Sequence, residues 1–227
     1  VVRPVDGLQI RDIQYRPAEW QTDYSSYKDY EVTVTGVVTT PQDFNSIMGG
    51  MAIQDQSAEW SGVYVRGALN ADVNIGDLVS VTGVVTERDD NDPRWRWGTY
   101  INVDDQDNIT VIGEGEDIDP IIVSVQDISS MQFMAENYEA VLVRLENFQV
   151  GIIDTAVFPT YIPVTDLGEE PEFTAWMTTQ GLSEDQIGDI GLGTLEHETV
   201  FEWIVGVFSE NQKYGIAPRW GEDVGPF

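Results

Sequence analysis

The sequence has no cysteine, one histidine and only two lysines among 227 residues. The absence of cysteine excludes disulfides and thiolate-ligated zinc or iron–sulfur sites. The single histidine, His197, excludes metal sites built from several histidines and leaves little basis for acid–base catalysis by imidazole. Because it stands between Glu196 and Glu198, we expect a surface histidine in an acidic loop. No apolar run approaches the roughly 20 residues of a membrane-spanning helix.

Positive charge is also scarce, since 11 Lys+Arg face 40 Asp+Glu and the formal net charge is −29. Up to residue 117 there are eight cations and 21 acids, and after it three cations and 19 acids. Neither half is therefore cationic, and both repel nucleic acid phosphates. Such a surface suits high salt, divalent cations or a solvent-facing coat, and it is equally typical of plain solubility.

Strand patterns dominate the first half of the chain. Val32–Thr39 and Val79–Thr86 are nearly the same β-branched string, and each holds a glycine at the same place, Gly36 and Gly83, where we expect a bulge or a bend. The remaining strands are predicted within three stretches: Met51–Asp55, Gly62–Arg66 and 98–112. Five strands at this spacing predict a Greek-key barrel of the OB type.

The second half repeats the first in a more divergent form. Leu8–Ile13 is similar to Ile122–Ile128, and Tyr30-Glu31 is similar to Tyr138-Glu139. A repeat of domain size indicates two copies of one fold. We therefore predict an all-β protein of two consecutive OB-like Greek-key β-barrels, residues 1–117 and 118–227.

The later part of the second barrel is predicted from two strands and one insertion. The strands are expected at Val200–Val207 and Lys213–Ala217. Between the barrel's strands, the acidic, glycine-rich stretch 182–195 is expected to form a long inserted loop. One helical turn is expected within it, with Ser183 as the N-cap residue.

Several segments together resemble one family pattern: Ile10–Tyr15, Val32–Thr39, Ala52–Asp55, Trp60–Val65, Gly76–Val85, Tyr138–Val143 and Tyr214–Val224. The pattern is similar to the paired OB-like region of bacterial secreted and surface proteins. This region also occurs beside extracellular nucleases of the endonuclease/exonuclease/phosphatase class, whose catalytic domain normally follows it. The resemblance implies the fold for nearly the whole chain, whereas a fold does not by itself specify a function.

One basic, aromatic segment stands out between the fourth and fifth predicted strands, comprising Arg88, Arg94, Trp95, Arg96 and Trp97. In OB barrels this loop commonly borders the binding face. Three interpretations remain open: stacking on bases or sugars, a contact with another protein, or local pairing with neighbouring acids. Trp20 and Trp60 are expected to serve as packing residues.

Two runs are dense in oxygen ligands: Asp89, Asp90 and Asp92, and Asp104, Asp105 and Asp107. Ca²⁺ prefers such oxygens, although neither run has the spacing of an EF-hand loop. The runs therefore indicate either Ca²⁺ sites or solvated loops, and Ca²⁺ is the only cofactor that the sequence suggests. Asn108 begins a single N-glycosylation sequon.

No nucleophile elbow and no phosphate-binding loop is found in the sequence, and acids are too abundant for any pair to indicate catalysis. We therefore expect a non-enzymatic, extracellular or cell-surface structural or interaction module that could self-assemble, with other protein subunits or surface glycans as partners. The alternative is an accessory region of a secreted nuclease that binds single-stranded nucleic acid or carbohydrate. The charge of −29 weighs against nucleic acid.

Overall fold

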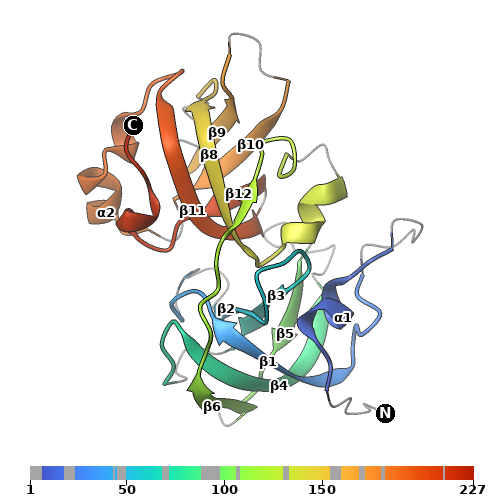
Figure 1. The fold of residues 1–227 in the computed structure, drawn as a ribbon. Coiled ribbons are helices and arrows are strands. Elements are labelled where there is room, and N and C mark those ends of the chain that lie inside the picture. The colour runs from blue at the N-terminus through green and yellow to red at the C-terminus, as the bar shows by residue number, and fades with distance from the viewer. Residues whose placement is uncertain are drawn as a thin grey trace.

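The structure is a computed structural model that describes residues 7–17, 24–42, 44, 50–67, 72–87, 98–105, 108–129, 133–153, 160–168, 172–179, 182–211 and 213–227. It confirms an all-β protein with two consecutive, closed, five-stranded barrels (Figure 1). The two barrels are stacked, with the short helix α1 (Ile10–Gln14) beside the first and the C-terminal end of the chain beside the second. Among the described residues, no helix has the length and apolar character needed to cross a membrane.

The first barrel is formed by five strands in the order β1-β2-β3-β5-β4, and β4 closes it by pairing with β1. β3 and β5 are parallel, while the other neighbours are antiparallel. This is the strand order of an OB barrel. A sixth strand, β6, extends along the free part of β4. The bounds are β1 Glu31–Val38, β2 Gly50–Gln54, β3 Gly62–Arg66, β4 Asp77–Glu87, β5 Thr99–Asn102 and β6 Ile109–Glu114.

The second barrel repeats this topology in the order β8-β9-β10-β12-β11, and β11 closes it by pairing with β8. Its parallel pair is β10 with β12, which corresponds to β3 with β5. An additional short strand, β7, pairs with β8 in parallel. The bounds are β7 Ile121–Val123, β8 Leu142–Val150, β9 Tyr161–Asp166, β10 Thr174–Thr178, β11 Val200–Asn211 and β12 Lys213–Ala217.

The equivalence of the two barrels extends to single residues. Val32 lies opposite Gly83, and Val143 lies opposite Gly206. A Cβ on either glycine would come within 2.5 Å of a backbone carbonyl oxygen of the neighbouring strand. Close approach of that strand explains both glycines, and the register of β1 with β4 passes Gly83 without the expected bulge.

Two expectations about the strands need correction. The stretch 98–112 was expected to hold one strand, but it holds β5 and most of β6, because β4 is long enough to pair with both. The two copies of the repeat also align differently at their start from the predicted alignment of Tyr30 with Tyr138. The Tyr30 amide donates to the carbonyl of Tyr27, just as the Val141 amide donates to that of Tyr138. Tyr138 therefore corresponds to Tyr27 and not to Tyr30.

Short helices lie outside the barrels. α1, Ile10–Gln14, begins where the Gln9 amide donates to Asp12 at 2.9 Å. The second half of the chain has the same hydrogen bond, because the Ser124 amide donates to Asp127 at 2.9 Å. Ser183 is the N-cap of α2, Glu184–Asp189, as predicted, and its hydroxyl accepts from the Gln186 amide. The 3₁₀ turns are η2 Phe133–Tyr138, η3 Leu192–Thr194 and η4 Gly221–Asp223.

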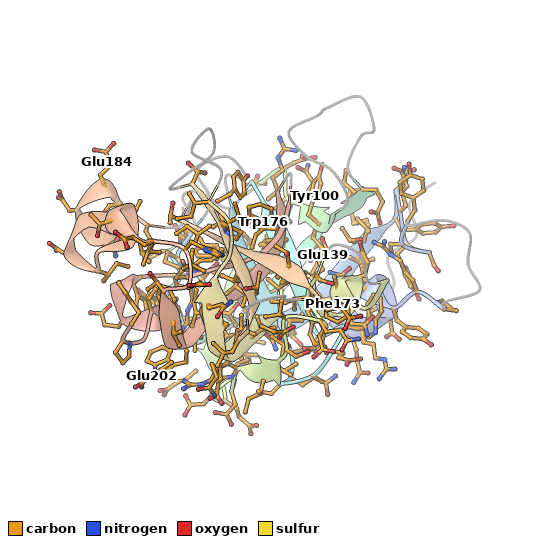
Figure 2. All side chains as sticks on the ribbon, turned by 90° about the horizontal axis from the view of Figure 1, so that it is seen from above. Tyr100, Glu139, Phe173, Trp176, Glu184 and Glu202 are labelled. Atoms are coloured by element: carbon orange, nitrogen blue, oxygen red, sulfur yellow. The ribbon has the colours of Figure 1, made fainter. Side chains whose placement is uncertain are left out.

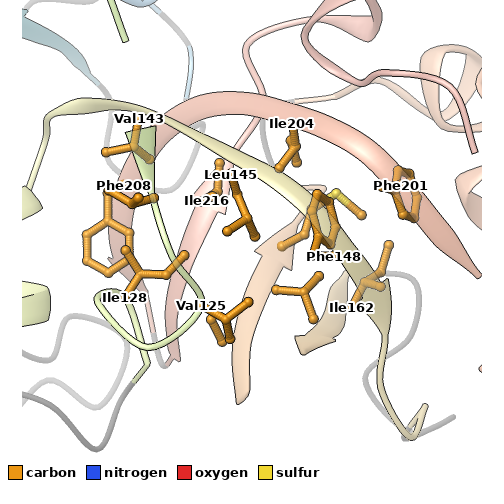
Figure 3. Close-up of a cluster of buried hydrophobic side chains, with 14 of the residues drawn as sticks. Val125, Ile128, Val143, Leu145, Phe148, Ile162, Phe201, Ile204, Phe208 and Ile216 are labelled. Atoms are coloured by element: carbon orange, nitrogen blue, oxygen red, sulfur yellow. The ribbon is translucent and has the colours of Figure 1, made fainter. Parts of the chain in front are cut away.

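The cores of the two barrels are filled differently. The buried cluster of the first barrel consists only of Ile, Val and Met side chains. The cluster of the second barrel adds three fully buried phenyl rings, Phe148, Phe201 and Phe208 (Figure 3). It also receives Leu192 and Leu195, so the insertion between β10 and β11 contributes directly to this core.

Candidate functional site at the junction of the barrels

The basic, aromatic segment of the sequence prediction lies outside the described residues. Arg88, Arg94, Trp95, Arg96 and Trp97 all fall within the stretch 88–97, so its three interpretations stay predictions. The first acidic run, Asp89, Asp90 and Asp92, falls in the same stretch, and Asp107 also lies outside the described residues.

The remaining predicted positions lie on the surface. Asp104 and Asp105 are exposed after β5, and Asp104 accepts a hydrogen bond from the Asn102 amide group. Asn108 is exposed before β6, and His197 is exposed before β11. Within the part of the chain that the structure describes, no group of three or more His, Asp or Glu is arranged to hold a metal ion.

The outer face of β2 and β3 is covered by the second barrel. Ala52 and Tyr64 pack in one buried cluster with Leu142, Val207 and other residues of the second barrel. The Tyr64 hydroxyl donates to the backbone carbonyl of Phe208 at 3.1 Å. This face is where OB barrels commonly bind single-stranded nucleic acid, and here a protein partner within the same chain occupies it.

Polar contacts add to the apolar packing between the barrels. The amide of Leu142 donates to Gln54 Oε1 at 2.9 Å in a buried position. At the far end of the chain, Arg219 binds both oxygens of Asp223 and also donates to the backbone carbonyl of Thr39. Hydrogen bonds from Leu142 to Gln54 and from Arg219 to Thr39 therefore join the two barrels in addition to the apolar packing.

A buried charged cluster lies at the junction. Arg16, whose side chain is 9% exposed, is 3.8 Å from Glu87 of the first barrel and 3.4 Å from Glu136 of the second. Arg16 also donates to the Thr99 hydroxyl at 2.7 Å, and the Thr99 amide donates to Glu139 at 2.9 Å. One guanidinium thus stands among three carboxylates that come from both barrels.

Burial raises the pKa of two of these acids, Glu139 and Glu87. It raises the pKa of Glu139 well above its ordinary value; the nearby Glu136 acts in the same direction, Arg16 opposes it, and Glu87 raises it further. Burial also raises the pKa of Glu87, against the hydrogen bond from the Ser25 amide and the charge of Arg16. Figure 2 shows Glu139 inside the molecule, whereas Glu184 and Glu202 lie at its rim.

A pocket of about 520 Å³ opens beside this cluster, and we call it the junction pocket; it is lined by Arg11, Tyr15, Arg16, Ala58, Glu59, Trp60 and Asn137. One wall comes from α1 and the residues that follow it. α1 is held from the first barrel, because the Ile10 amide donates to Asp55 at 2.9 Å and Gln14 donates to the Gly62 carbonyl at 2.8 Å.

The second wall is the turn between β2 and β3. It holds Trp60 at a φ of 65°, a left-handed conformation that is costly for a bulky side chain. The Trp60 amide donates to the carbonyl of Asn137 in the second barrel at 2.7 Å. A Cβ at Gly62 would lie 2.2 Å from the carbonyl oxygen of Ala140, so the glycine permits this close approach of the barrels.

Aromatic and polar groups meet in the junction pocket. Tyr15 and Trp60 stand nearly perpendicular, with ring centroids 5.7 Å apart, and the Arg11 guanidinium lies 5.1 Å from the Tyr15 ring centre. Glu59 accepts hydrogen bonds from Asn137 and Tyr138. From the sequence, Trp60 is expected to be a packing residue. The sequence does not predict the pocket, because contacts between residues far apart in the chain bring its lining together.

A second candidate surface is the outer edge of β6. Within the described residues, β6 pairs with β4 alone, and Val111 and Ile112 are 44% and 52% exposed. The register with β4 is regular from Ile109 to Val111 and shifts at the next residue. β6 therefore presents a short open edge and two apolar side chains to solvent.

No family model matches this sequence, and no curated protein is detectably similar to it.

Proposed function

We propose that this chain is an extracellular, non-catalytic structural or interaction module that binds other protein subunits, including copies of itself, through the β6 edge. The observation that carries the proposal is the open edge of β6 with Val111 and Ile112 exposed. Exposed edges with apolar side chains are templates for contact with another chain. The charge of −29 opposes self-association, so assembly would need Ca²⁺ or cationic side chains, such as Arg94 and Arg96, at the contact.

The arrangement of the barrels supports a structural role. Two small barrels share a buried apolar cluster and buried hydrogen bonds, which makes a stiff unit suited to repeated assembly. The face that an OB barrel would use for single-stranded nucleic acid is already covered by the second barrel. This weighs against the accessory nucleic-acid role on the first barrel.

Sedimentation velocity of the full chain, with Ca²⁺ and then with excess chelator, tests the proposal. We expect larger species for the unchanged protein and their loss in Ile112→Lys. The matched control is Ile152→Lys, which adds the same charge at a side chain that is 83% exposed and lies outside the strands. A second variant, Trp95→Ala/Trp97→Ala, tests whether segment 88–97 takes part. A monomer under every condition would refute self-assembly.

A second candidate function is the accessory binding of carbohydrate. The junction pocket favours it, because the two aromatic rings lie beside amide and carboxylate groups. Neutral sugars are not repelled by the acidic surface, whereas nucleic acid is.

A further inference from the structure

We propose that the junction pocket is a binding site for a neutral saccharide, with Tyr15 and Trp60 as the stacking surfaces and Arg11, Glu59 and Asn137 as the hydrogen-bonding groups. This inference rests on the second candidate function and assigns a role in it to each residue of the pocket, and it is independent of contacts between subunits through β6. It rests on the described geometry of the pocket between α1, the β2–β3 turn and η2.

The aromatic part of the pocket fits the apolar face of a sugar ring. Tyr15 and Trp60 meet at an interplanar angle of 83°, so they form two walls of a corner. The faces of aromatic rings are electron-rich, and the C–H bonds of a pyranose carry small positive charges that suit such a face. Tyr15 remains 44% exposed, so its side chain is accessible to a ligand.

The polar part of the pocket fits hydroxyl groups. Arg11 offers donors only, Glu59 offers acceptors, and the Asn137 amide offers both. Glu59 is held in place by the hydrogen bonds from Asn137 and Tyr138, each 3.2 Å long. A few polar groups around aromatic walls are the usual composition of a small-ligand site.

The charge balance of the pocket favours a neutral ligand over an anion. Arg16 faces two acids, Glu136 and Glu87, and Arg11 lines the pocket together with Glu59, so the pocket and its surroundings carry no excess positive charge that would attract an anion. The net charge of −29 on the whole chain repels polyanions from the entrance. Acidic polysaccharides and single-stranded DNA should therefore bind less well than neutral oligosaccharides.

The pocket is formed before any ligand arrives, because both barrels hold its walls. Trp60 is fixed by the hydrogen bond from its amide to Asn137. Asp55 holds the start of α1 through the Ile10 amide. A wall that is already ordered lowers the entropic cost of binding. The Trp60 backbone has an unfavourable positive φ, and its side chain lines the pocket.

The test is isothermal titration calorimetry of the full chain with four neutral probes: cellohexaose, laminarihexaose, maltohexaose and chitohexaose. Hexagalacturonate and the oligonucleotide dT6 serve as anionic comparisons. We expect at least one neutral probe to bind, and we expect Tyr15→Ala to weaken that binding at least about tenfold. Tyr30→Ala is the matched control, since Tyr30 is 43% exposed and also stands edge-to-face with a neighbouring aromatic ring.

Trp60→Gly separates binding from folding. Glycine accepts a positive φ, so this variant keeps the turn, removes the ring and should lose binding while it stays folded by circular dichroism. The inference is overturned if no neutral probe binds, if Tyr15→Ala and Trp60→Gly bind as the unchanged protein does, or if an anionic probe binds better. Sedimentation of Tyr15→Ala should be unchanged, and sugar binding by Ile112→Lys should be unchanged, so the two proposals fail separately.

Discussion

The two barrels share a topology but differ in what fills and covers them. Among the described residues, the buried cluster of the first barrel holds Ile, Val and Met side chains, and the outer β2–β3 face of this barrel is buried against its neighbour. The second barrel needs three phenyl rings and leucines from an insertion to fill the same arrangement of strands. Strand order is therefore compatible with quite different packing, provided that the close strand contacts are kept.

At the junction, in contrast to the two apolar cores, both barrels contribute charged side chains to one cluster. The first barrel contributes Arg16 and Glu87, and the second contributes Glu136 and Glu139. Buried ionisable groups are thus concentrated where the two repeats meet, and each repeat alone would hold an incomplete set. Variants that separate the contributions of the barrels test this description.

Arg16→Met should have the largest effect. It removes the cation that stands among the three carboxylates, and breaking such buried pairs costs about 3–5 kcal/mol of the free energy of unfolding. The loss should be greatest at pH 8 and shrink on acidification, because the carboxylates then take up protons. Urea denaturation at several pH values measures it. A loss below about 1 kcal/mol at pH 8 would contradict the role of Arg16.

Gly83→Ala and Gly206→Ala should have similar effects, because the two glycines occupy equivalent positions. Each new Cβ would meet a backbone oxygen at 2.5 Å, and such overpacking costs about 1–3 kcal/mol. Thermal and urea unfolding of both variants measures the two losses. The control is Gly113→Ala, where a Cβ would have nothing within 4 Å. Strongly unequal losses would show that the barrels respond differently to the same strain.

Glu139→Gln should change the pH dependence of stability. The pKa of Glu139 is raised in the folded protein by burial and by Glu136. Between its ordinary value and the raised value, the folded state binds more protons than the unfolded state, so the free energy of unfolding falls as pH rises. Removing this carboxyl should flatten that decrease at pH values above the ordinary pKa of a glutamate.

The exposed Glu202 provides the control for this pH experiment. Glu202→Gln changes the net charge by the same amount, and it should leave the slope of stability against pH nearly as it is in the unchanged protein. Equal slopes for Glu139→Gln and Glu202→Gln would indicate that general charge repulsion, and not the buried cluster, governs the pH dependence.

Tyr64→Phe should have the smallest effect. It removes the hydroxyl that donates to the Phe208 carbonyl across the barrels, while the ring still fills the shared cluster. The expected loss is about 0.5–1.5 kcal/mol, measured by urea denaturation against the exposed control Tyr30→Phe. No loss would mean that packing alone holds the covered face.

Much of the fold could be predicted because its signals are local. The β-branched alternation of Val32–Thr39 predicted β1, and the bounds of β3 and β12 were found as predicted. Ser183 was recognised as an N-cap from its place before an acidic turn. The similarity of Ile10 and Ile13 to Val125 and Ile128 also predicted the repeat, and all four side chains are buried.

The candidate site could not be predicted in the same way. Arg16 lies 3.8 Å from Glu87 and 3.4 Å from Glu136, although both acids are remote from it in sequence. Nothing in the string around Trp60 distinguishes a packing residue from a pocket wall. With 40 acids in the chain, no sequence pattern singles out Glu139 and Glu87 as carboxyls that become buried.

The sequence by itself determined the barrel class, the existence of a repeat, most strands of the first barrel and the acidic charge, because these depend on residue periodicity and composition. Only the tertiary structure decided which barrel face is covered and which charges are buried together. It also decided where aromatic rings form the junction pocket. Those features depend on how two closed barrels pack, and the contacts involved join residues that no local pattern relates.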